Sequence, residues 1–124
     1  KEDHIATIVF SGLALLLSGS VTDRPYSIAV GSGSAAFVVS TGSLQAERSG
    51  LRAVFTTTDA STVQYVTYTS DFTTVAMSGT LLTEFGVFSS GAVLSGTMWN
   101  RETFASVTFD GTNELQCQVS FRIV

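Results

Sequence analysis

A strict alternation of apolar and polar residues marks the C-terminal part of the chain. Apolar side chains, Cys117 among them, occupy every second position from 115 to 123, and polar side chains occupy the positions between them. Because successive side chains of a strand point to opposite faces, the pattern predicts a strand with one buried face and a buried Cys117. Segment 104–109 is predicted to pair with this strand through Asp110-Gly111, since Asp-Gly provides the positive φ of a tight hairpin.

Most of the chain upstream is rich in Thr, Val, Phe and Tyr, residue types that fit a pleated sheet. Turn-forming residues interrupt these stretches about every eight to twelve residues, a spacing typical of an antiparallel sandwich or a flattened barrel. The predicted strands span 26–30, 51–58, 62–69, 72–80, 81–88 and 92–99, with turns at 59–61, 70–71 and 89–91.

Segment 5–17 has a helical pattern instead. Its apolar residues follow the i, i+3, i+4 spacing of one helical face, and the Ser-Gly-Ser stretch at 18–20 provides a stop. The alternative is a pair of short strands broken at 11–12. The predicted fold class is therefore mainly β: an antiparallel β-sandwich or flattened barrel with one short N-terminal helix, in a single domain over residues 1–124.

Composition narrows the classes of function. The 124 residues carry a formal net charge of −4, with 44% hydrophobic and 13% charged residues, which argues against intrinsic disorder. This acidic balance lacks the basic surface that nucleic acids require. No apolar stretch reaches the roughly 18 residues of a membrane span, and Glu2 and Asp3 stand where a signal peptide would be positively charged. We expect neither nucleic acid nor membrane among the partners.

Residues that carry enzymatic chemistry are scarce. His4 is the only histidine and Cys117 the only cysteine, so neither a nucleophilic triad nor a Cys/His metal site can be assembled within one chain. Stretch 31–36 fits the G-x-G-x-x-A spacing of dinucleotide-binding loops, but no βαβ unit surrounds it, which favours a plain glycine-rich loop. The carboxylates are dispersed, mostly at turns. We expect no enzyme, catalytic residue, cofactor or metal; a loop-built calcium site and a two-carboxylate glycosidase remain alternatives.

Glu84 differs from the other acids because it lies inside the apolar run 81–88. In a strand it shares a face with Leu82 and Phe88, so its carboxylate is expected to be buried. A buried carboxylate is costly unless a cation and hydrogen bonds compensate it. We expect a structural ion pair with Arg48 or Arg52, and a catalytic acid is the alternative.

Trp99 and Met98, together with Tyr65 and Tyr68, form the candidate interaction surface. Exposed aromatic rings stack on sugars or anchor protein interfaces, whereas the ordinary alternative for each is packing in the core. Tyr65 and Tyr68 stand an odd number of positions apart, so on a regular strand one is expected in the core and the other at the surface.

Gly12 with its apolar helix-like stretch and then four further stretches resemble, in this order, a group of small virion proteins of tailed bacteriophages. The four further stretches are Ile28-Ala29-Val30-Gly31-Ser32-Gly33, Leu44-x-x-Glu47-Arg48, Leu82-Thr83-Glu84-Phe85-Gly86-Val87-Phe88 and the alternating segment 115–123. The group carries an IAVGTG-like loop, an L-x-x-E-x-x-R-like stretch and an I-T-E-x-G-L-F-like strand. Here Arg48 directly follows Glu47, and Val87 replaces the usual Leu. The resemblance covers about residues 12–124.

This resemblance implies a β-rich structural component of a phage particle without enzymatic activity. The leading hypothesis is a capsid decoration or cement protein, located in the virion, that binds other virion proteins such as the major capsid protein or tail proteins, and that is itself a homo-oligomer. The alternatives are a tail fibre or baseplate component, a carbohydrate- or receptor-binding module with an aromatic platform around Trp99, and a small glycosidase-like enzyme.

Overall fold

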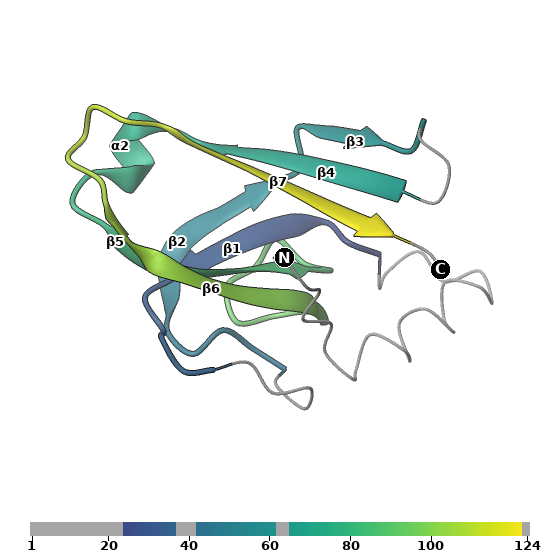
Figure 1. The fold of residues 1–124 in the computed structure, drawn as a ribbon, viewed down its shortest axis with the longest axis horizontal. Coiled ribbons are helices and arrows are strands. Elements are labelled where there is room, and N and C mark those ends of the chain that lie inside the picture. Colours follow the sequence, from purple (N-terminus) through teal and green to yellow (C-terminus); the bar gives the residue numbers. More distant parts are fainter. Residues whose placement is uncertain (1–23, 37–41, 62–64, 123–124) are drawn as a thin grey trace.

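The computed structural model describes residues 24–36, 42–61 and 65–122 and shows two layers of antiparallel strands (Figure 1). The two sheets are separate, so the predicted mainly β fold is confirmed and the described strands form a sandwich rather than a closed barrel. The helix predicted for 5–17 lies outside the described residues. The first sheet has the order β2-β1-β5-β6 and the second the order β3-β4-β7, with bounds β1 (Ser27–Gly31), β2 (Glu47–Val54), β3 (Thr57–Asp59), β4 (Tyr65–Phe72), β5 (Leu81–Phe88), β6 (Met98–Thr108) and β7 (Leu115–Arg122).

The main core lies between the two sheets. Burial of apolar side chains from both inner faces is the dominant stabilising term of such a sandwich. Trp99 of β6 meets Phe121 of β7 edge to face, with ring centroids 6.2 Å apart, and so joins the sheets directly. The buried members of this core are Ile28, Val30, Leu51, Phe72, Met77, Leu82, Val87, Trp99, Phe109 and Val119.

The first sheet is also covered on its outer face. Every residue of β1 is buried, which matches its position between β2 and β5 and the loops that lie over it. Ala29, Leu44, Phe88 and Met98 form a second, smaller cluster on this face. The outer face therefore offers a dry environment in which charged side chains must be paired.

The predicted C-terminal hairpin is wrong. β7 pairs along its whole length with β4, from Phe72 opposite Leu115 to Tyr65 opposite Arg122, and not with β6. The Asp110 carboxylate accepts a hydrogen bond from the Thr112 N–H at 2.9 Å, and Gly111 has a φ of 93°, so the turn itself forms. This turn carries the chain from one sheet to the other instead of folding it back on the same sheet.

The faces of β7 follow the predicted alternation. Residues 115, 117, 119 and 121 are buried or half-buried, and those between them are exposed. Periodicity thus identified the buried face correctly, although it carried no information about the partner strand.

Several predicted strand boundaries also need correction. The strand expected over 51–58 is divided between β2 and β3, because the Phe55 N–H donates to Tyr26 and the Thr56 N–H donates to Thr69 of the other sheet. The turn expected at 70–71 lies within β4, and the strand expected over 72–80 is replaced by the single helical turn α2 (Thr74–Met77). Residues 92–97 form a loop, and β6 begins only at Met98.

Candidate functional site

A fully buried carboxylate on the outer face of the first sheet is the most elaborate polar site in the described residues. Glu84 of β5 is 0% exposed. Its Oε1 accepts hydrogen bonds from the N–H groups of Gly33 at 3.0 Å and Ala46 at 2.7 Å, and its Oε2 accepts from the Gln45 N–H at 3.1 Å. The Nε of Arg101 donates to Oε2 at 2.6 Å and supplies the opposite charge.

These four donors keep the carboxylate ionised. Burial by itself raises the pKa of Glu84, but the backbone N–H groups and Arg101 act against burial and together hold this pKa below the ordinary value. A carboxylate that already accepts bonds from four donors is poorly suited to take a proton from a substrate. We therefore interpret the Glu84 carboxylate as a structural anchor for the surrounding loops.

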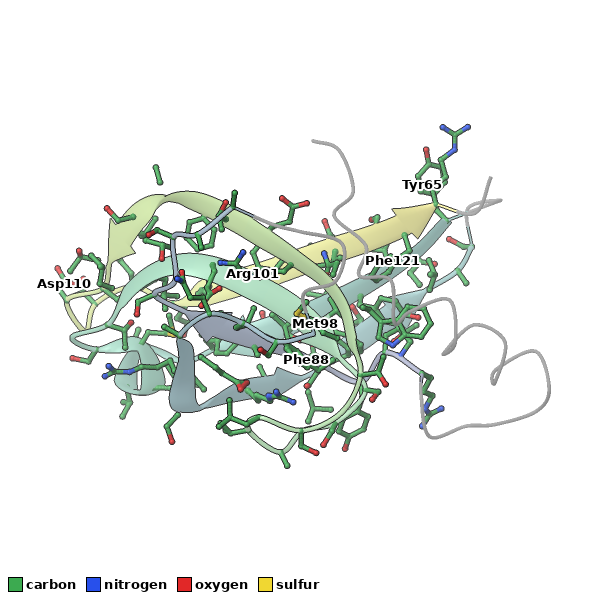
Figure 2. All side chains as sticks on the ribbon, turned by 90° about the horizontal axis from the view of Figure 1, so that it is seen from below. Tyr65, Phe88, Met98, Arg101, Asp110 and Phe121 are labelled. Carbon is green, nitrogen blue, oxygen red and sulfur yellow. The ribbon has the colours of Figure 1, made fainter. Side chains whose placement is uncertain are left out.

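The predicted burial of Glu84 is correct, but the predicted partner is wrong. Arg101 of the neighbouring strand β6 makes the ion pair, whereas Arg52 pairs with Glu47 and Arg48 is exposed. Arg101 lies opposite Gly86 in the β5–β6 register, which puts its side chain on the same face as Glu84. Identifying it from the sequence would have required the pairing of β5 with β6. In Figure 2, Arg101 lies near the middle of the molecule, between Asp110 and Tyr65 at the two ends.

The prediction that Glu84 shares a strand face with Leu82 is also wrong. Leu82 packs in the core between the sheets, while Phe88 belongs to the outer cluster. The β5–β6 register shifts between Leu82 and Glu84, and this irregularity breaks the simple alternation.

The glycine-rich loop owes its composition to Glu84. A Cβ atom at Gly33 would stand 2.6 Å from Oε1 of Glu84, and one at Gly31 would overlap the backbone of Ala46. The G-x-G pattern thus allows backbone to approach a protein carboxylate, and no nucleotide is needed to explain it. Arg101 holds the same loop through Nη1, which donates to the Ala35 carbonyl at 2.8 Å.

A second buried ion pair secures the loop over residues 89–97. Arg52 donates from Nε and Nη2 to both oxygens of Glu47, and its Nη1 donates to the carbonyls of Ser90 and Ser95, each at 2.8 Å. Glu47 in turn accepts a bond from the Leu94 N–H at 2.8 Å. Leu94 is held at a φ of 57°, a left-handed conformation that costs a residue with a Cβ atom about 1–2 kcal/mol.

Of the four residues of the candidate interaction surface, only Tyr65 is classed as exposed. Trp99 and Met98 are 6% and 0% exposed, so the structure contradicts an aromatic platform around Trp99. Tyr65 is 41% exposed and has Arg122 over its ring at 5.9 Å, whereas Tyr68 stacks on Phe55 with centroids 4.4 Å apart. Burial raises the pKa of the Tyr68 hydroxyl. The two tyrosines therefore differ in burial as their odd spacing predicts.

An open cavity of about 520 Å³ lies between the sheets on the side of β6 and β7. Its walls are mainly apolar, with Phe85 and Phe104 on one side and residues of β7 on the other. Asn100 and Glu102 of β6 also line it. Glu102 is opposite Phe85 in register, whereas Glu84 points to the other face, so the two buried glutamates do not flank one cleft.

The described ranges contain no group of three or more His, Cys, Asp or Glu side chains placed to hold a metal ion. In the same part of the chain, no helix has the length and hydropathy needed to cross a membrane. Comparisons with protein-family models, curated proteins and solved structures found no match to this chain.

Proposed function

We propose that the protein is a structural component of a tailed-phage particle, a capsid decoration or cement protein that acts by binding other virion proteins. Two kinds of support are combined. The order of sequence motifs resembles small virion proteins, and three of these motifs meet in space around one carboxylate.

That convergence is the observation that carries the proposal. The glycine loop at 31–33, the stretch 44–47 and strand β5 are far apart in the sequence, yet all contribute to the hydrogen bonds around Glu84. These three stretches of the resemblance therefore form one hydrogen-bonded frame, whereas segment 115–122 belongs to the other sheet. Such a frame suits a subunit that must keep its conformation while it is bound by neighbouring proteins in an assembly.

Sheet edges provide the means of association. An edge strand presents unpaired N–H and C=O groups that can pair with another chain. Within the described sheets, β2, β6, β3 and β7 are edge strands. We infer that contacts with virion proteins use these edges together with neighbouring apolar surface.

The direct test uses particles of the phage whose genome encodes this chain. Mass spectrometry of purified particles is expected to find the protein in many copies, and electron microscopy is expected to place it on the capsid. Particles that lack the gene are expected to lose their DNA at lower temperature than complete particles. Recovery of the protein only from the soluble lysate would overturn the proposal, and a location on the tail would favour the fibre or baseplate alternative.

A further inference from the structure

Among the strands that the structure describes, β7 is an edge strand without the features that usually block edges. Proteins protect exposed edges with bulges, prolines, lysines or very short strands. β7 has eight residues, pairs with β4 without a register shift, and contains neither Pro nor Lys. The other described edges are less suited to pairing: β3 has only three residues, and the pairings of β2 and β6 contain irregularities.

The cavity between the sheets opens beside this edge. Its β7 wall includes Leu115, Cys117 and Val119, and its opposite wall includes Phe85 and Phe104. Phe104 is 36% exposed. A strand added to β7 would carry alternate side chains over this apolar surface, so backbone pairing and hydrophobic burial would occur together.

The charges on β7 indicate which strand would fit. On its exposed face, Glu114 stands just before the strand and Arg122 stands at its end, with Gln118 midway between them. If two β7 strands pair antiparallel with Gln118 opposite Gln118 of the partner subunit, each Glu114 lies opposite Arg122 of the partner subunit. The edge is therefore complementary in charge to a second copy of itself, and a two-fold axis would pass through the centre of the strand.

We propose that two copies of this chain associate through their β7 edges and join their second sheets into one continuous six-stranded sheet. This inference deepens the proposed function because it names a binding surface and a first partner. The role of such a dimer in a phage particle rests on the proposed function. Its test uses the purified chain alone, so its outcome is separate from that of the particle experiment.

Sedimentation velocity over a range of protein concentrations is the first measurement. The wild-type chain is expected to form dimers that weaken as salt is added. Arg122→Glu places like charges opposite each other at two symmetric positions and is expected to weaken dimerisation by about tenfold or more. Glu114→Arg is expected to act similarly, and the double variant to recover to within about threefold of wild type. Arg48→Glu, on β2, is the matched control and is expected to leave dimerisation unchanged.

Disulfide trapping then tests the register. In a Cys117→Ser background, Gln118→Cys places two thiols opposite each other across the axis, and mild oxidation is expected to give a covalent dimer. Gln116→Cys, on the same face, is expected to give no covalent dimer, because its neighbour would be Ser120 of the partner subunit. Far-UV circular dichroism checks that each variant is folded.

Three results would overturn the inference. They are a wild-type chain that stays monomeric at every concentration, a dimer that responds equally to Arg122→Glu and Arg48→Glu, and cross-linking through position 116 instead of 118. Presence in the virion would still be decided by the particle experiment.

Discussion

A carboxylate that leaves water must recover hydrogen bonds and opposite charge from the protein. Glu84 recovers both, from three backbone N–H groups and Arg101. Its burial was predictable because it stands within an apolar run. The identity of the cation was not, because it depends on which strand lies beside β5. At the residue scale, the sequence predicts that a charge needs a partner, and strand pairing selects the partner.

Replacing the carboxylate tests this arrangement. Glu84→Gln preserves shape but leaves the Arg101 cation buried without its counterion, so it is expected to lower the free energy of unfolding by about 3–5 kcal/mol. Urea unfolding at pH 7 measures the change. Arg48→Gln, at an exposed charged position outside the proposed dimer contact, is the control and is expected to be close to wild type. A Glu84→Gln variant as stable as this control would contradict the anchoring role.

The same interaction predicts the response to acid. The pKa of Glu84 is lower in the folded protein than the ordinary value of 4.5. Its contribution is therefore complete above about pH 4.5 and is lost as the pH falls through the lower, folded pKa. The unfolding free energies of wild type and Glu84→Gln are expected to converge in that acidic range. A difference between them that stays constant with pH would exclude this linkage.

Cys117 gives a second prediction at this scale. Burial, and next the negative charge of Asp71, raises the pKa of its thiol to about 11. Only the thiolate reacts readily, so labelling by iodoacetamide at pH 8 is expected to be on the order of 100-fold slower in the folded protein than in urea. Equal rates in the two states would show that the thiol is open to solvent, contrary to its position on the inner face of β7.

At the scale of elements, local patterns predicted which segments are strands better than they predicted how those strands connect. The alternation in 115–123 identified the inner face of β7, and the Asp110-Gly111 turn forms. An Asp-Gly turn has the same local geometry whether the chain folds back or crosses to the other sheet. The prediction of a terminal hairpin failed for this reason. The single helical turn α2 was not predicted because its residues Thr74 and Val75 are typical of strands.

The glycine loop offers a prediction with an internal control. Gly33→Ala forces a methyl group against Glu84 and Gln45, so a loss of about 1–3 kcal/mol in the free energy of unfolding is expected. Gly42→Ala introduces the same group where nothing lies within 4 Å and is expected to be neutral or slightly stabilising. Thermal melts of both variants make the comparison. Equal effects would mean that stability does not depend on the close approach of the Gly33 backbone to Glu84.

For the whole molecule, the chain passes between the two sheets three times, after β2, after β4 and after β6. Neither sheet can therefore be completed by a contiguous part of the described chain. The main core contains side chains from both sheets, and Trp99 and Phe121 touch across it. This interdependence leads us to expect cooperative unfolding.

Cooperativity has a convenient reporter, because Trp99 is the only tryptophan of the chain. Its fluorescence reports the contact between the sheets, and far-UV circular dichroism reports the strands themselves. The two signals are expected to change at the same urea concentration. A fluorescence transition that precedes the other would show that the sheets separate before either one unfolds.

The pairing of β7 with β4 also affects how the chain is made. Roughly forty residues of synthesis separate the end of β4 from the start of β7, which at about 5–20 residues per second is a delay of about 2–8 seconds. Throughout that interval the nascent chain on the ribosome offers β4 as an open edge, with Phe72 still lacking its neighbour Leu115. Neighbouring nascent chains on one polysome are then within reach of each other's edges, so chaperones that shield exposed strands would act on this protein between the synthesis of its fourth strand and that of its seventh.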